Sequence, residues 1–227
     1  MTGMLFSADL QTEYENLDLL KKVEDQWFEY ADKKRIQALV LLGDLKSRYN
    51  PIDVRVVNAM VYLVKRFTDR KVQVLVNCGN HDRVGMYNDR ETWLPILQEA
   101  GAEVFTEPGV VQVNQVSLYF LPFRSSVEQL KEGAQDLKKL RKKNTDAECH
   151  VLCFHADLSQ AQYNVSTESR SKLSVDELFP QEYDYVVGGH IHMFQRVKYP
   201  NVFYVGSPFP MDWGEVNSQK GFMLLEI

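Results

Sequence analysis

The chain has 227 residues, of which 44% are hydrophobic and 25% are charged, and this ordinary globular composition excludes a fibrous or disordered protein. Its formal net charge of −5 argues against a surface that binds nucleic acid through Lys and Arg alone, although bound divalent cations would offset that charge locally. Neither a signal peptide nor a long apolar run or lipidation motif is recognised in the sequence, so we expect a cytoplasmic location and no membrane association.

Short apolar runs alternate with longer amphipathic segments in the first half of the chain. The apolar runs, which have the character of buried strands, are residues 4–8, 38–42 and 72–76. In the amphipathic segments, apolar residues recur every three or four positions. These segments are residues 13–35, whose first apolar residue is Tyr14, residues 54–67, and a stretch around Trp93, Leu94 and Leu97. This alternation predicts an α/β fold in which helices connect parallel strands.

The second half of the chain has shorter strands and indicates a second sheet. The predicted strands are residues 110–113, 117–121, 151–154, 185–187, 202–205 and 222–226. A basic segment from Lys131 to Lys143 lies among them and could track DNA. We favour a solvated helix instead, because Leu137 and Leu140 give the segment an apolar side. Residues 1–227 are expected to form a single domain.

The cysteines are interpreted as structural. Cys149 and Cys153 are close enough in sequence to suggest a metal-binding pair, but the hydrophobic run CHVLCFH around them predicts a buried strand. With Cys78 the total is three, and this odd number is typical of a reducing compartment.

Polar residues of a few kinds follow five of the predicted strands. In chain order they are Asp9, then Asp44, then Asn80 with His81 and Asp82, then His155, and finally His190 with His192. Each block alone has a structural explanation, such as a helix cap or a glycine turn. In open α/β sheets, however, ligands bind at the carboxyl ends of the strands. Five such blocks at five strand ends therefore predict one shared site.

The residue types indicate the class of metal that such a site would hold. Carboxylates, an amide oxygen and neutral imidazoles suit Mn, Fe, Zn or Mg better than a metal that prefers thiolates. Without cations, clustered carboxylates and imidazoles would be costly to desolvate. We therefore expect divalent cations as the cofactor.

The motifs around these residues resemble those of the calcineurin-like metallophosphoesterases. The matching motifs are GD at 43–44, GNHD at 79–82, CFHADL around His155 and GGHIH at 188–192. The segments EYDYVVGGHIHMFQRV, FYVGSPFPMDWGE and KGFMLLEI further resemble the nuclease subunit of SbcCD-type DNA-repair complexes. The resemblance implies a four-layer α/β/β/α sandwich of two mixed sheets flanked by helices, with the metals at its rim.

The resemblance also implies a role for each polar residue. Two cations, with manganese as the expected metal, would be held on one side by Asp9, Asp44 and His192, and on the other by Asp44, Asn80, His155 and His190. Asp44 would then bridge the two cations. His81 would face the scissile phosphate, with Asp82 behind it to fix its tautomer and orientation.

Gln11 departs from the first motif of that family, which is Asp-x-His. The first cation therefore loses an imidazole ligand. Gln11 either ligates through its amide oxygen, which is a weaker donor for a borderline metal, or points away and leaves the position to water. We expect a weaker or more selective first site, because Asp9, Asp44 and His192 remain.

The resemblance implies a metal-dependent phosphodiester hydrolase, a DNA exonuclease or endonuclease acting in DNA repair or processing. Two alternatives stay open: a phosphodiesterase or phosphatase of a nucleotide or another small phosphoester, and a non-catalytic scaffold with a degraded metal site. The capping domain and the coiled-coil-binding helices of the family are not recognised before Ile227. An SbcC-like ATPase partner and a homodimer are further expectations drawn from the resemblance.

Overall fold

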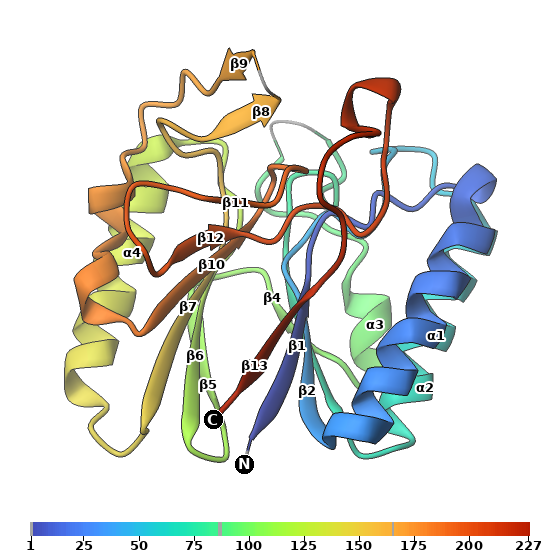
Figure 1. Ribbon diagram of the computed structural model, residues 1–227, viewed down its shortest axis with the longest axis horizontal. Coiled ribbons are helices and arrows are strands. Elements are labelled where there is room, and N and C mark those ends of the chain that lie inside the picture. The colour runs from blue at the N-terminus through green and yellow to red at the C-terminus, as the bar shows by residue number, and fades with distance from the viewer. Residues whose placement is uncertain (1, 86–87, 165) are drawn as a thin grey trace.

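The structure is a computed structural model that describes residues 2–85, 88–164 and 166–227. Two mixed sheets pack face to face at the centre of the molecule, and helices cover the outer face of each (Figure 1). The expected four-layer sandwich is therefore confirmed. No helix in the described part of the chain is both long and apolar enough to cross a bilayer.

The first sheet contains the strands predicted in the first half of the chain. Its strands, in spatial order, are β13 (Met223–Glu226), β1 (Gly3–Ser7), β2 (Ile36–Leu41), β3 (Gln73–Asn77) and β4 (Glu103–Phe105). The strands β1 to β4 are mutually parallel, and β13 is antiparallel to β1. Since parallel strands point the same way, the residues that follow β1, β2 and β3 lie at one edge of the sheet.

Three helices cover the outer face of the first sheet: α1 (Leu17–Lys34), α2 (Val54–Thr68) and α3 (Pro95–Glu99). Apolar side chains at the predicted helical spacing, such as Trp27 of α1 and Phe67 of α2, are buried against the sheet.

The boundaries of two of these helices differ from the prediction. The segment predicted to be helical from residue 13 begins with a separate 3-10 turn, η1 (Tyr14–Asn16), and Tyr14 is 51% exposed. The tighter turn rotates Tyr14 away from the apolar face. The third helix starts only after Trp93 and Leu94, because Pro95 occupies its first turn, where the missing N–H is tolerated.

The second sheet has a mixed arrangement. Its strands, in spatial order, are β11 (Gln195–Arg196), β12 (Val202–Tyr204), β10 (Tyr185–Gly189), β7 (Cys149–His155), β6 (Val116–Leu121) and β5 (Gly109–Val113). The four central strands are parallel, and β5 and β11 are antiparallel to their neighbours. The carboxyl ends of β7 and β10 therefore lie at the same edge of this sheet.

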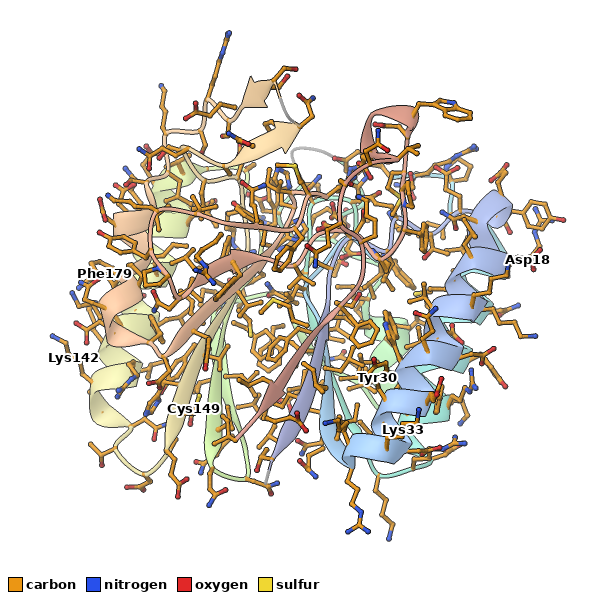
Figure 2. All side chains as sticks on the ribbon, in the orientation of Figure 1. Asp18, Tyr30, Lys33, Lys142, Cys149 and Phe179 are labelled. Carbon is orange, nitrogen blue, oxygen red and sulfur yellow. The ribbon has the colours of Figure 1, made fainter. Side chains whose placement is uncertain are left out.

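The basic segment forms the helix α4 (Val127–Lys143), which covers the second sheet together with the 3-10 turns η2 (Val175–Leu178) and η3 (Pro180–Glu182). The side chains of Lys131 and Lys142 lie 2.7 Å and 3.8 Å from the carboxylates of Glu177 and Glu182. Lys142 lies on the outer side of α4, at the edge of the molecule (Figure 2). The interpretation as a solvated helix is confirmed.

One detail of that interpretation is wrong. Leu137 is buried as expected, but Leu140 is 41% exposed. The apolar cluster beneath α4 takes in Leu130, Ala134 and Leu137 and does not extend to Leu140.

The cysteines are buried and free, as the interpretation of the sequence predicted. Cys149 and Cys153 both lie on β7 (Figure 2 labels Cys149) and contribute to the apolar cluster between the sheets. Burial raises the pKa of Cys149 to about 11 and that of Cys153 well above its ordinary value. Such thiols are small apolar side chains.

Several short elements were not predicted. Besides β4 and β11, they are the hairpin of β8 (Gln162–Asn164) and β9 (Thr167–Glu168), and the 3-10 turn η4 (Trp213–Glu215). The hairpin and the loop that carries η4 project beyond the upper ends of the sheets in Figure 1. They lie at the end of the molecule where the candidate site is found.

Candidate metal centre

The carboxyl ends of parallel strands from both sheets meet at one edge of the sandwich. His155 is the last residue of β7, and its Nδ1 donates a hydrogen bond of 2.7 Å to the carbonyl of Leu42, directly after β2. The backbone N–H of His190, directly after β10, donates to both carboxylate oxygens of Asp9, at 2.9 and 3.0 Å. These contacts join the two sheets where the predicted ligands emerge.

Four residues predicted to hold one cation lie together. Ligand atoms of Asp44, His155 and His190 all lie within 4.8 Å of one another. Oδ1 of Asn80 lies 3.0 Å from Nε2 of His155 and 2.9 Å from Nδ1 of His190. The group combines one carboxylate, one amide oxygen and two imidazoles, donors that suit a borderline or hard divalent cation.

The hydrogen bonding of His155 fits a bound cation. Because its Nδ1 donates to a carbonyl, the neutral ring presents a lone pair at Nε2, facing Oδ1 of Asn80 and Oδ1 of Asp44, the latter at 3.4 Å. Three acceptors this close together need a proton or a cation between them. Burial lowers the pKa of His155, but Asp44 outweighs it and raises this pKa to about 9. A divalent cation can replace that proton.

His190 is held in the form that ligates metals. Burial, and then the neighbouring His155, lower the pKa of His190 to about 3, so its ring is neutral. Burial raises the pKa of Asp44, but His155 outweighs it and holds this pKa well below its ordinary value. The carboxylate of Asp44 is therefore ionised and available to a cation.

Asp9 and Gln11, two of the residues predicted to hold the other cation, contact this group. Asp9 is buried, and burial raises its pKa to about 6. Gln11 is also buried, and its Nε2 donates a hydrogen bond of 2.9 Å to Oδ2 of Asp44. The alternative in which Gln11 points away is therefore wrong. Rotation of its amide by half a turn would present Oε1 at the same place.

Several of these residues have backbone conformations that L-amino acids rarely adopt. The φ angles of Asp9, Gln11, Asp44 and His190 are 51°, 42°, 54° and 97°. Such conformations cost free energy and are found preferentially at functional sites. The backbone at Gly79 also lies too close to Asp44 to admit a side chain, because an added Cβ would lie 2.2 Å from Oδ1 of Asp44.

Asp82 does not orient His81, so the role expected for it is wrong. Its carboxylate accepts hydrogen bonds from the backbone N–H of Asp44, Leu45 and Gly79, at 2.8 to 3.0 Å, and from the indole of Trp93 at 3.2 Å. These donors come from the loops after β2 and β3. Asp82 therefore joins the two loops that carry metal ligands.

His81 is oriented by residues of the loop that follows β2. Its Nδ1 donates to the carbonyl of Ser47, and its ring stacks on Tyr49 with centroids 4.8 Å apart and planes inclined by 21°. The hydroxyl of Tyr49 accepts a hydrogen bond of 3.3 Å from Nδ2 of Asn80. Tyr49 thus contacts both His81 and a predicted ligand. Nothing in the local sequence of residues 46–49 indicated this role.

Glu215 was also missed as a contributor to the site. Its Oε1 lies 2.8 Å from Nδ1 of His192, and its Oε2 lies 2.6 Å from Nζ of Lys220. Burial raises the pKa of Glu215, but its bonds to His192 and Lys220 outweigh burial and lower this pKa to about 2. A carboxylate behind a histidine is common where that histidine binds a metal. The signal in the sequence was the GE that follows the last histidine motif.

Two clefts open on the site. One, with a volume of 450 Å³, is lined by Gln11, His81 and His192 among others. The other, with a volume of 300 Å³, is lined by His190 and His192 together with residues of β8 and η4. Of the predicted site residues, Gln11, His81 and both histidines of GGHIH therefore line clefts that open to solvent.

Comparison with known proteins agrees with this geometry. The family model described as calcineurin-like phosphoesterase matches residues 5–194. This range includes every predicted site residue.

Three relatives are proteins of DNA repair or nuclease subunits by name. A DNA double-strand break repair protein Mre11 from Nanoarchaeum equitans is 22% identical over 248 residues, covering 99% of this chain and 63% of that protein. A subunit of the nuclease SbcCD from Staphylococcus epidermidis is 22% identical, covering 91% and 60%. An Mre11 from Methanopyrus kandleri is 24% identical, covering 82% and 43%. The chain thus spans less than two thirds of the length of each of these relatives.

A solved structure shares the fold. It is described as GAP50, the anchor in the inner membrane complex of Plasmodium, and superposes with a TM-score of 0.59 at 14% sequence identity. The superposition covers 98% of this chain and 80% of that one.

Proposed function

The chain belongs to the calcineurin-like phosphoesterase family, and we propose that it is a nuclease that cleaves phosphodiester bonds in DNA. The observation that carries this proposal is the meeting of Asp44, His155 and His190, with Asn80 between the two rings. The names of the relatives, which are a nuclease subunit and DNA break repair proteins, favour DNA as the polymer.

We assign two divalent cations to the site, with Asp44 shared between them. Asp9, Gln11 and His192 would complete the first set of ligands, and Asn80, His155 and His190 the second. When bound, such a pair supplies a nucleophile from water at neutral pH and offsets charge on the phosphoryl oxygens. The mixed donor set suits manganese, and iron, zinc and magnesium are tested beside it.

His81 is the residue that we assign to the leaving oxygen. Its proton at Nδ1 is held by the carbonyl of Ser47, so Nε2 is the atom available to the substrate in the 450 Å³ cleft. Stacking on Tyr49 keeps the plane of the ring fixed. From the imidazolium form of His81, a proton donated from Nε2 would neutralise the leaving oxygen as its bond to phosphorus breaks, and the proton at Nδ1 would remain on the neutral ring.

The test is a cleavage assay with manganese on end-labelled single-stranded and duplex DNA, beside a generic phosphodiester. Wild-type protein should cleave DNA, and His81→Ala should lower kcat by about 100-fold or more, the usual contribution of a general acid. Turnover of the small diester with intact DNA would favour a small phosphoester as substrate. Absence of any hydrolysis, and of bound metal, would favour the scaffold.

A partner protein is part of the same proposal. The relative from Staphylococcus epidermidis is by name one subunit of the SbcCD nuclease. We therefore propose an SbcC-like ATPase as partner and a homodimer as the assembly. Co-purification with the tagged chain tests the first, and light scattering of the purified chain tests the second.

A further inference from the structure

The two clefts beside His192 are divided by one segment of the chain. This segment is residues 209–215: its first three residues line the 450 Å³ cleft, whereas Asp212, Gly214 and Glu215 line the 300 Å³ cleft. His192 lines both clefts. A substrate strand that crosses His192 from one cleft to the other must therefore pass this dividing segment.

Trp213 stands in the middle of the dividing segment, and its side chain is 94% exposed. By contrast, Trp27 is buried and Trp93 is half-buried. An indole bears a large apolar area that proteins rarely leave in water. An exposed indole offers a flat face on which a nucleobase can stack.

The dividing segment is held firmly against the site. Two residues after Trp213, the carboxylate of Glu215 lies 2.8 Å from His192 and accepts a hydrogen bond of 3.0 Å from the backbone of Met211. Lys220 lies 2.6 Å from the same carboxylate. Hydrogen bonds of the residues before and after Trp213 therefore hold its backbone close to His192.

A second aromatic residue, Tyr163 of β8, lines the smaller cleft. Its hydroxyl donates a hydrogen bond of 2.8 Å to Asp157. That bond fixes the orientation of a ring that is 41% exposed. The cleft therefore offers a preoriented aromatic surface to a ligand.

Within the described part of the chain, the clefts themselves offer no Lys or Arg contact to flanking phosphates. Among the described residues that line them, none is Lys or Arg, and four are acidic: Glu13, Glu15, Asp212 and Glu215. Proteins that hold duplex DNA do so mainly through Lys and Arg on its phosphates. Inside the clefts, contacts beyond the cations are therefore made to bases or sugars.

The geometry points to recognition of an unpaired nucleobase, which stacks on Trp213 while a neighbouring nucleotide enters the cleft of Tyr163. This inference rests on the proposed function and specifies its substrate class. The faces of bases inside a duplex are covered by their neighbours, and only their edges are exposed in the grooves. Stacking on Trp213 therefore selects single-stranded ends or free nucleotides, which present the same chemistry.

The test uses the intrinsic fluorescence of the purified chain in manganese. The probe is a pentathymidylate with phosphorothioate linkages, which resist cleavage, and its matched form lacks the central bases. The complete probe should quench the fluorescence of Trp213, and Trp213→Phe should remove most of that change. Trp213→Ala should weaken binding of the complete probe by between about 5-fold and 150-fold, the usual loss for one stacked base.

The control variant is Val216→Ala, which removes another exposed apolar side chain close to the same segment and should bind like wild type. The affinity of wild type for the complete probe should also depend weakly on salt, with the slope expected for fewer than about two phosphates. Equal binding by Trp213→Ala and Val216→Ala would overturn the inference. So would binding of a closed circular duplex as tightly as the single strand.

These outcomes separate the inference from the proposed function. If DNA is cleaved in manganese while Trp213→Ala binds like wild type, the nuclease stands and the stacking role is overturned. If thymidine monophosphate quenches Trp213 and only small nucleotides are hydrolysed, the stacking role stands and DNA is replaced as substrate.

Discussion

Oε1 of Glu215 lies 2.8 Å from Nδ1 of His192, so a carboxylate that is not itself a proposed metal ligand orients the ring of one. The opposite oxygen of Glu215 is held by Lys220 at 2.6 Å. A histidine fixed in this way keeps the proton on Nδ1 and leaves Nε2 free to ligate.

Replacement of Glu215 should therefore weaken the binding of the cation that His192 is proposed to hold. Glu215→Gln removes the charge that stabilises the Nδ1 proton, and the affinity for that cation should fall by about 10- to 100-fold. Calorimetric titration with manganese measures this. The control is Glu15→Gln, which removes an acidic side chain from the neighbouring cleft without contact to His192. Equal affinities in both variants would exclude the assigned role of Glu215.

Tyr49 should affect turnover more than binding. Tyr49→Ala removes both the stacking on His81 and the hydrogen bond to Asn80, so kcat should fall by about 10- to 100-fold at nearly constant KM. Tyr49→Phe keeps the ring and should retain most of the activity.

The matched control for Tyr49 is Tyr62→Ala on α2, whose side chain is exposed and remote from the site. A kcat for Tyr49→Ala equal to that of Tyr62→Ala would show that His81 needs no support from this ring.

Substitution of Asp82 should lower the free energy of unfolding, because its carboxylate holds two loops together and does not orient His81. Asp82→Asn places an amide NH₂ among four N–H donors, and the free energy of unfolding should fall by about 2 to 4 kcal/mol. Asp89→Asn, which loses a partly exposed carboxylate that accepts hydrogen bonds from the backbone of Ser125, should cost less than about 1 kcal/mol. Urea denaturation compares them. An unchanged midpoint for Asp82→Asn, with turnover lost, would restore the role of orienting His81.

The stability of the fold should depend on pH through Glu24. Its carboxylate is buried on α1, 3.5 Å from Arg66, and burial raises its pKa from the ordinary 4.5 to about 7 despite that guanidinium. Because the folded state binds the proton more tightly, the stabilisation is complete below pH 4.5 and is lost as pH rises through about 7.

Glu24→Gln should flatten this dependence and raise the free energy of unfolding at pH 8 by on the order of 2 kcal/mol. Asp32→Asn, at an exposed position on the same helix, should leave the pH profile unchanged. Thermal unfolding between pH 5 and pH 8 provides the measurement. An identical decline with pH in Glu24→Gln and wild type would contradict the assignment.

The strands and the positions of the candidate ligands could be predicted from the sequence because both are local signals. Most of β2 lies in the continuous apolar run of residues 38–42, and Asp44 follows the end of the strand within three residues. Parallel strands then bring their carboxyl ends together, which is why residues as distant as Asp9 and His190 lie in contact.

The roles of Asp82, Ser47, Tyr49 and Glu215 could not be predicted in the same way. Each depends on which loop lies opposite, and that is decided by tertiary packing rather than by local pattern. Asp82 was assigned to its sequence neighbour His81, but its carboxylate faces the backbone of the preceding loop. The contact between Gln11 and Asp44 likewise depends on the backbone conformation at both residues.

The central claim is that side chains from both sheets hold a pair of cations around Asp44, and metal stoichiometry tests it most directly. Equilibrium dialysis against manganese, followed by elemental analysis, should give two ions per chain for wild type. Variants His155→Ala and His190→Ala should each lose one ion, whereas His150→Gln, a buried histidine on the same strand β7, should keep both. Wild-type protein that binds no stoichiometric metal, or that keeps both ions after loss of His155 and His190 together, would contradict the account.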